Sequence, residues 1–173
     1  MILTAHILTG AAIISRTTNP ILGFLFAFFS HYFLDSLPHQ EYPIDNILKK
    51  EWKQTKKEFL KVFLDIFAGF LIILIVLFLK NKGEMDTWRF YFQNLPIFLG
   101  GFLGILTDGL TFLYLLLPKS KFLETLQNFH QKVHFLNSRN KLSPNSAPPK
   151  GAGLGLFTQL LIGVLAIYFL YTP

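Results

Sequence analysis

The chain has 173 residues, of which 51% are hydrophobic and only 15% are charged, and its formal net charge is +6. Soluble domains usually contain about 25% charged residues, so this composition excludes a typical soluble protein and favours one that faces lipid. Cysteine is absent, which excludes disulfides, thiolate metal sites and a cysteine nucleophile. The basic residues flank apolar segments, where they report membrane topology, so we expect no nucleic-acid partner.

The start of the chain predicts two short apolar helices joined by a tight turn. Residues 1–15 are apolar, and because Arg16 follows them, we interpret them as a retained helix rather than a cleaved signal peptide. Asn19 and Pro20 are a typical cap and first helical residue for a second apolar helix over 21–37. These two helices are expected to form an antiparallel hairpin.

The middle of the chain predicts two long membrane spans. Residues 39–58 are polar and rich in lysine, and Asp45 is a candidate cap for an amphipathic helix that continues directly into an apolar span over 59–79. A mixed polar loop over 80–92 leads to a second span over 95–117, whose glycines permit close helix contact. Both spans reach the ~20 residues that a transmembrane helix needs.

The end of the chain predicts an amphipathic helix, a linker and a final span. Apolar residues recur in 120–137 at alternating steps of four and three, which favours a helix in the membrane interface or against the bundle. Residues 138–153 have the composition of a flexible linker, and 154–171 form a last span. The predicted fold class is therefore all-α, a polytopic membrane bundle of about five spans plus one interfacial helix, in a single membrane-embedded domain over 1–173.

Lysine and arginine are distributed unevenly between the two sides of this arrangement. Twelve lie on the side of the N-terminus: Lys49, Lys50, Lys53, Lys56, Lys57, Lys61, Lys119, Lys121, Lys132, Arg139, Lys141 and Lys150. Four lie on the other side: Arg16, Lys80, Lys82 and Arg89. The positive-inside rule then predicts a multi-pass membrane protein with a cytoplasmic N-terminus and membrane lipids as partners.

Histidines and aspartates that this topology places in one half of the membrane are candidate metal ligands. His31 and Asp35 are four residues apart, so both project from one helix face, and His130 and His134 repeat this spacing. The full candidate set is His6, His31, Asp35, His39, Asp65, Asp108, His130 and His134. Imidazole and carboxylate ligands without sulfur suit zinc, and also manganese or iron.

Asp65 and Asp108 interrupt apolar spans, where a lone charge costs roughly 2.5–3.5 kcal/mol, so intramembrane acids are commonly functional. With Asp35 they are the candidate catalytic residues, one of them acting as a base. Two structural interpretations stay open. Asp65 could pair with Lys61, its neighbour four residues earlier, and Asp108 could hydrogen-bond across a helix contact.

Two segments resemble a known family. They are A-H-I-L-T-G-A-A, which contains His6, and S-H-Y-F-L-D-S-L-P-H, which contains His31, Asp35 and His39. They are similar to the bacterial membrane-bound metal-dependent hydrolases, which are distantly similar to zinc-dependent phospholipases C. The resemblance covers mainly the first 40 residues and implies phosphoester hydrolysis. The family's Pro-Asp-x-Asp-His and His-Arg-Gly-x-Thr-His segments do not occur here, and the pair His130/His134 is the candidate replacement.

The leading hypothesis is a metal-dependent hydrolase that acts on a lipid or another amphiphilic phosphoester at the cytoplasmic leaflet. The alternative is a non-catalytic membrane protein that transports or senses a divalent metal or protons, because intramembrane acids and histidines serve ion relays equally well. A third hypothesis is a scaffold whose polar residues only hold helices together. Polar residues gathered at one depth favour hydrolysis, whereas polar residues through the full thickness would favour transport.

Overall fold

The computed structural model describes residues 2–39, 44–81, 87–138 and 152–172, and this part of the chain contains helices and no strand. The helices are α1 (Leu3–Arg16), α2 (Pro20–Ser36), α3 (Asp45–Leu48), α4 (Lys56–Lys80), α5 (Thr87–Leu116), α6 (Lys121–Ser138) and α7 (Ala152–Tyr171). The predicted all-α fold class is confirmed.

The turn between α1 and α2 forms where the sequence predicts it. The side-chain oxygen of Asn19 accepts hydrogen bonds from the backbone N–H groups of Ile21 and Leu22, at 3.0 and 3.3 Å, and Pro20 begins the helix. This cap satisfies N–H groups that have no partner within the helix. At its other end, α2 stops before Pro38, which cannot continue a helix.

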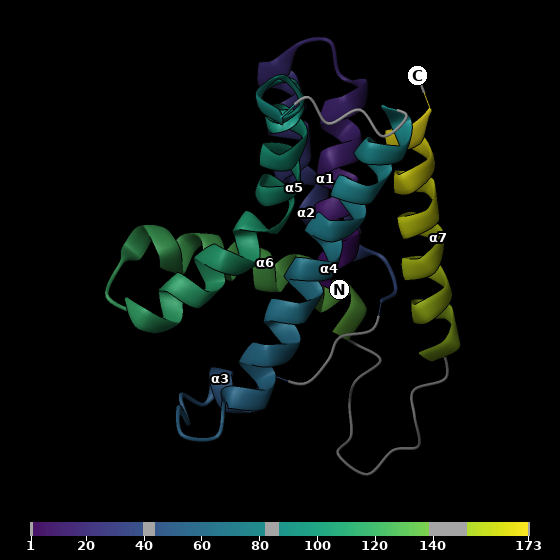
Figure 1. Ribbon diagram of the computed structural model, residues 1–173. Coiled ribbons are helices and arrows are strands. Elements are labelled where there is room, and N and C mark those ends of the chain that lie inside the picture. The colour runs from purple at the N-terminus through teal and green to yellow at the C-terminus, as the bar shows by residue number, and fades with distance from the viewer. Residues whose placement is uncertain (1, 40–43, 82–86, 139–151, 173) are drawn as a thin grey trace.

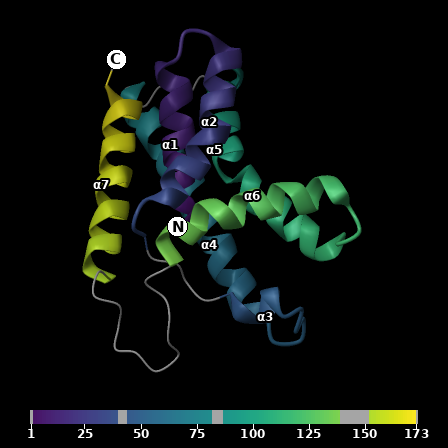
Figure 2. The same cartoon turned by 180° about the vertical axis from the view of Figure 1, so that it is seen from behind.

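Helix α1 lies at the centre of the bundle, in contact with α2, α4, α5 and α7 (Figures 1 and 2). Nine of its fourteen residues are buried. Its apolar side chains, including Ile7, Leu8 and Ala11, form the main hydrophobic core together with Ile73 and Leu77 of α4. Protein therefore surrounds this short helix on most sides.

Glycines bring α1 and α5 into backbone contact. A Cβ atom at Gly104 of α5 would overlap the carbonyl oxygen of His6, and one at Gly10 of α1 would overlap the carbonyl oxygen of Gly100. The close contact predicted from the α5 glycines is therefore confirmed at these positions. Gly109 does not take part, because a Cβ atom there would meet no atom of the described structure within 4 Å.

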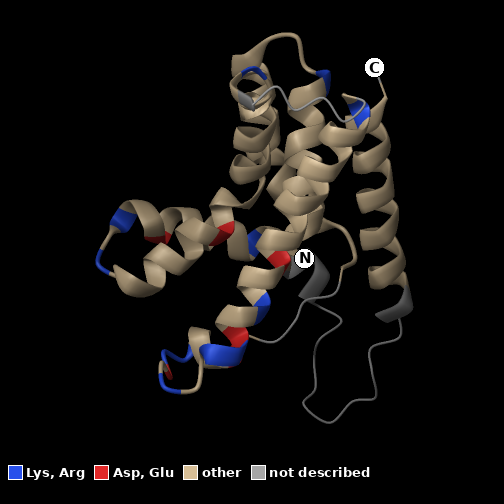
Figure 3. Cartoon of the chain, in the orientation of Figure 1, with Lys and Arg blue, Asp and Glu red and all other residues tan. Residues whose placement is uncertain are grey.

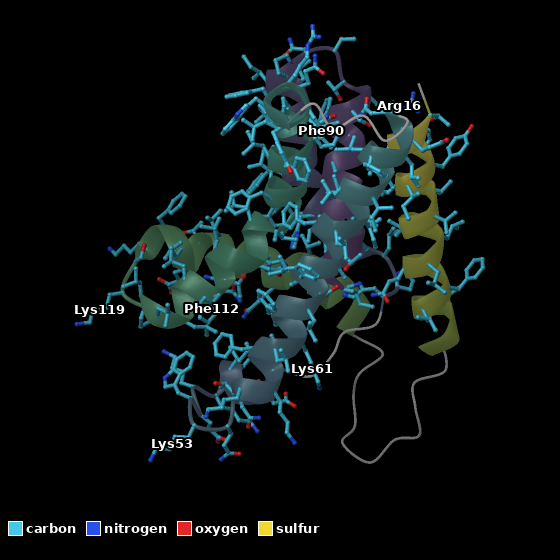
Figure 4. All side chains as sticks on the ribbon, in the orientation of Figure 1. Arg16, Lys53, Lys61, Phe90, Phe112 and Lys119 are labelled. Atoms are coloured by element: carbon cyan, nitrogen blue, oxygen red, sulfur yellow. The ribbon has the colours of Figure 1, made fainter. Side chains whose placement is uncertain are left out.

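The C-terminal part of α5 and helix α6 form a hairpin arm that projects sideways from the bundle (Figures 1 and 2). Phe112 and Lys119 mark this arm in Figure 4. Helix α6 contacts α5 and α2 through a face that includes the buried Leu123 and His130. Phe122 and Phe129, which belong to the predicted apolar face, are exposed instead. The arm thus presents one face of α6 to the bundle.

Three helices of the described chain are long and apolar enough to cross a membrane: Lys56–Lys80, Trp88–Leu116 and Leu154–Tyr171. Large apolar side chains such as Phe63 and Phe157 remain exposed on them, as expected for helices that face lipid. The prediction of about five spans is therefore too high. Helices α1 and α2 have only 14 and 17 residues, fewer than the ~20 needed to cross the hydrocarbon core.

The predicted continuous helix from Asp45 into the next span is wrong. Helix α3 ends at Leu48, the backbone of Lys50 adopts a φ of 60°, and α4 begins only at Lys56. A non-glycine residue with positive φ interrupts a right-handed helix, so the polar segment folds as a turn in front of α4.

The predicted start of the second long span also differs. Helix α5 begins at Thr87, inside the predicted polar loop over 80–92, and Phe90 of this first part is buried in the main core. Pro96 then lies inside the helix, a position tolerated in membrane helices. Most of the predicted linker over 138–153 lies outside the described residues.

Two cations hold the C-terminus of α7 at the end of the bundle marked by Arg16 in Figure 4. Arg16 donates from Nε to the carbonyl oxygen of Phe169 at 2.9 Å, and its guanidinium also donates to the hydroxyl of Thr172. Lys80 donates to the carbonyl oxygens of Leu170 and Thr172, at 3.1 and 3.0 Å. Cations at this position satisfy the last carbonyls and interact favourably with the helix dipole.

Candidate metal centre

Seven of the eight predicted ligands meet near the start of α1, the end of α2, the middle of α5 and the face of α6 that covers them. They form three overlapping groups whose ligand atoms lie within 4.8 Å of one another. The groups are His6, His31 and Asp108; His31, Asp35 and His130; and Asp35, His39 and His134. These are His/Asp groups that could hold a metal ion.

The carboxylate of Asp35 lies at the centre of the cluster. Its Oδ2 atom is 3.0 Å from Nε2 of His31, 2.9 Å from Nε2 of His130 and 2.8 Å from Nε2 of His134. Its Oδ1 atom is 3.2 Å from Nε2 of His6. One carboxylate therefore contacts four imidazole rings from three helices.

Backbone carbonyls fix the orientation of two of the rings. Nδ1 of His31 lies 2.9 Å from the carbonyl oxygen of Gly104, and Nδ1 of His39 lies 2.7 Å from that of Leu37. Because a carbonyl oxygen can only accept, each Nδ1 must carry the proton. In the neutral ring, Nε2 then presents a lone pair.

A hydroxyl and an amide fix His130 in the same way. Thr111 donates its hydroxyl proton to Oε1 of Gln127 at 2.7 Å, so the Thr111 oxygen is left to accept from Nδ1 of His130, which lies 3.1 Å away. The Nε2 lone pair of His130 therefore faces the centre of the cluster.

This orientation leaves a position that a cation would fill. Nε2 of His31 and Nε2 of His130 are 3.2 Å apart, and Nε2 of His134 is 3.0 Å from that of His130. Two lone pairs at this distance repel unless a proton or a metal ion lies between them. Neighbouring ligand atoms of a small tetrahedral metal ion with bonds of about 2.0–2.1 Å lie about 3.3 Å apart, and the observed separations are slightly shorter.

His6 adds a buried ring to this group. It is completely buried and stacks on His31 with ring centroids 4.3 Å apart. Among the described residues, no hydrogen-bond partner reaches its Nδ1 atom. An unsatisfied buried polar atom costs roughly 1–3 kcal/mol, and a bound ligand at this atom would remove that cost.

Burial also affects the pKa values of His6 and Asp35, which lie on α1 and α2, outside the three candidate spans. Burial lowers the pKa of His6 to about 4. Burial alone would raise the pKa of the Asp35 carboxyl, but its contacts with the surrounding imidazoles outweigh burial and hold this pKa well below its usual range. The resulting neutral His6 and ionised Asp35 are the forms that bind metals. Burial alone would lower the pKa of His31, but the carboxylates of Asp108 and Asp35 raise it, so without a metal the protonated ring is favoured.

One side of the cluster is accessible. The side chains of His134 and Asp108 are 26% and 36% exposed, whereas those of His31 and Asp35 are buried. Oδ1 of Asp108 is 3.7 Å from Nε2 of His31, so this carboxylate lies at the edge of the cluster. His134 and Asp108 are therefore the partly accessible members of the cluster.

Asp65 is the one predicted ligand that the structure places elsewhere. Its carboxylate accepts hydrogen bonds from the backbone N–H groups of Leu3 and Thr4, at 2.7 and 3.1 Å, and from the hydroxyl of Thr4 at 2.5 Å. It therefore caps the first turn of α1. This geometry does not support the prediction that Asp65 is a ligand.

Sequence reasoning missed Thr111 and Gln127. Gln127 precedes His130 by three residues on one helix face, which is a weak indication that the two act together. Thr111 lies on another helix, and no spacing in the sequence connects it to either residue.

No known protein family, curated protein or solved structure matches this chain. The interpretation of the site therefore rests on its own residues.

Proposed function

We propose that this chain is a membrane-embedded metal-dependent hydrolase and that zinc is its metal. The proposal rests on one observation, the convergence of the fixed Nε2 lone pairs of His31 and His130 on the single buried carboxylate of Asp35. Without a metal or a shared proton, such an arrangement is unfavourable, because buried polar atoms of like sign face one another. With a metal, the same atoms are ligands.

The buried group of His31, Asp35 and His130 would hold the metal. The other members would complete the cluster: His39 and His134, which are grouped with Asp35, and His6 and Asp108, which are grouped with His31. A zinc ion in this place supplies Lewis-acid activation of water and of a phosphoryl oxygen. Asp108, at the accessible edge, is the carboxylate best placed to accept a proton from the attacking water.

The proposed substrate is a lipid or another amphiphilic phosphoester. The resemblance of the first 40 residues to membrane-bound metal-dependent hydrolases favours a phosphoester, and the neighbouring apolar spans favour a substrate that is soluble in the membrane. The excess of lysine on one side favours a multi-pass inner-membrane protein with the N-terminus and the cluster toward the cytoplasm (Figure 3).

Transport of ions is the less favoured function. The core between the cluster and the end held by Arg16 and Lys80 is built from apolar side chains, among them Leu8, Ala12 and Leu77. A proton or metal path through the bundle would need polar side chains at these depths. The described polar ligands instead gather at one end.

The test is elemental analysis of the purified protein, comparing the wild type with His31→Ala/Asp35→Ala and with the exposed control Glu124→Gln. We expect zinc in the wild type and in the control, and none in the double variant. Negligible metal in all three would refute the metal centre, and equal metal in all three would show that the site is elsewhere.

Hydrolysis is tested separately with a panel of phospholipids and soluble phosphoesters. We expect turnover by the wild type and by Glu124→Gln, and its loss in the double variant. Metal binding without turnover of any substrate would refute the hydrolase and favour a transport or sensing role.

A further inference from the structure

The segment between α2 and α4 contains a folded unit that the metal centre does not use. Residues 45–58, called here the basic turn, comprise α3, the residues that follow it and the first residues of α4. Successive hydrogen bonds close this turn: Lys49 N–H donates to Asp45, Glu51 to Asn46 and Gln54 to Glu51, at 2.8–2.9 Å. The segment is therefore folded back on itself.

A buried glutamate holds the basic turn against α4. The carboxylate of Glu58 accepts hydrogen bonds from the backbone N–H of Asn46 at 3.1 Å, from the side chain of Asn46 at 2.8 Å and from the backbone N–H of Ile47 at 2.9 Å. These donors begin α3, so Glu58 caps it. Ile47 and Thr55 are buried inside the turn.

The outer side of the basic turn is both basic and apolar. Leu48 and Trp52 are 50% and 44% exposed, although both are large and apolar. The same segment exposes five lysines and two acids, Asp45 and Glu51; the lysines are Lys49, Lys50, Lys53, Lys56 and Lys57. Figure 3 shows this concentration of lysine around α3 and the start of α4, and Figure 4 places Lys53 at its tip.

The position of the basic turn identifies the surface it meets. It directly precedes the apolar part of α4, which is long and apolar enough to cross a membrane. Wherever α4 enters a bilayer, the turn lies at the level of the lipid headgroups. Exposed tryptophan and leucine insert at that level, and nearby lysines attract anionic headgroups.

We propose that the basic turn is a preformed binding surface for anionic lipid headgroups. Leu48 and Trp52 enter the interface, and Lys49 and Lys53 select negatively charged lipids. Glu58 keeps the turn folded before any lipid binds, so the surface is rigid rather than ordered by lipid. This proposal is independent of the metal centre.

The chain contains only two tryptophans, which allows a direct test. In Trp88→Phe, Trp52 is the single tryptophan. The full-length variant is reconstituted in two preparations of phosphatidylcholine vesicles. One contains phosphatidylglycerol brominated in its acyl chains, and the other contains brominated phosphatidylcholine at the same mole fraction. We expect brominated phosphatidylglycerol to quench Trp52 at least about twofold more strongly, since each nearby lysine enriches anionic lipid.

Variants and salt show whether the lysines cause this excess. In the Trp88→Phe background, Lys49→Gln/Lys53→Gln should abolish it, whereas Lys119→Gln/Lys121→Gln, at the tip of the arm, should leave it unchanged. Raising the salt from 0.1 to 1 M shortens the Debye length from about 10 to about 3 Å and should also abolish the excess.

Three results would overturn the proposal. Equal quenching by both brominated lipids would exclude lipid selection, and an excess that survives Lys49→Gln/Lys53→Gln would assign it to other residues. A Trp52 signal that brominated lipid does not quench, but that aqueous iodide does, would show that the surface faces water and fits a protein partner instead.

Discussion

Thr111 has no affinity for metals, yet it determines which atom His130 presents to the cluster. Its hydroxyl proton is committed to Gln127, so its oxygen accepts from Nδ1 of His130. Partners of this kind fix the tautomer and the angle of a metal-binding imidazole, and losing one usually costs about 10–100-fold in metal affinity. In the same way, the carbonyl oxygen of Gly104 determines which ring nitrogen His31 presents to the cluster.

We therefore expect Thr111→Val to weaken zinc binding about 10–100-fold. Thr111→Ser should bind as the wild type does, because it retains the hydroxyl. Competition with a chelator of known affinity measures the difference. Because valine has nearly the shape of threonine, equal affinity in all three proteins would show that Thr111 does not orient His130.

Asp65 gives a second prediction, because its contacts are those of a helix cap and a cap and a metal ligand respond differently to substitution. Asp65→Ala should lower the free energy of unfolding by about 0.5–2 kcal/mol, the usual cost of losing a helix cap. Asp65→Asn, which keeps one accepting oxygen, should lose less. Denaturant unfolding in detergent measures both.

The metal content of the Asp65 variants should stay at the wild-type value. A loss of zinc in Asp65→Asn without a loss of stability would contradict the cap and restore Asp65 as a ligand, as the sequence suggested.

Local spacing in the sequence accounts for two of the residue pairs that the structure brings to the cluster. His31 and Asp35, and likewise His130 and His134, are four residues apart on one helix, and both pairs face the cluster. Asp65 was misassigned because the cost of a buried charge shows that a partner exists without identifying it. Its partner is the N-terminus of α1, 61 and 62 residues away, which no local pattern reveals.

At the scale of helices, α1 shows why length and hydropathy predict membrane bundles incompletely. Its 14 residues are apolar enough to suggest a span, but they pack against four other helices. Hydropathy does not distinguish a side chain that faces lipid from one that faces protein, since both environments are apolar. The caps, the amphipathic helix and the apolar spans follow local rules and were predictable, whereas the number of spans was not.

The close contact between α1 and α5 predicts that adding a single methyl group at Gly104 lowers the stability of the protein. Gly104→Ala would place a Cβ atom against the carbonyl oxygen of His6, which must move. We expect a loss of about 1–3 kcal/mol in stability, the usual cost of overpacking, together with weaker zinc binding. Unfolding and chelator competition measure the two effects.

Gly109→Ala is the matched control, because the same methyl group meets open space five residues later on the same helix. It should be neutral or slightly stabilising, since alanine is the better helix former. If Gly104→Ala behaves like Gly109→Ala, the close contact does not exist in the native protein.

At the scale of the whole molecule, the cluster joins two pairs of consecutive helices, α1/α2 and α5/α6, which lie far apart along the chain. A metal that binds only the folded state adds stability that grows with its concentration, by about 2.7 kcal/mol at one hundred times its Kd. We therefore expect a strong chelator to lower the Tm, and zinc to restore it.

His31→Ala/Asp35→Ala should have the same Tm with chelator, with zinc or with neither. Differential scanning fluorimetry in detergent is sufficient for this comparison. If neither chelator nor zinc changes the Tm of the wild-type protein, no metal is part of the fold.

The glycine contact also determines which substitutions the protein can tolerate. His6, Gly104 and His31 are connected through main-chain atoms: the carbonyl of His6 lies against the α carbon of Gly104, whose own carbonyl holds His31. Changes of side chain at the outer surface leave this connection intact. Selection for activity would therefore act most strongly on Gly10, Gly100 and Gly104, although these glycines touch no substrate. Variants of this protein that have lost one of them should also have lost the cluster.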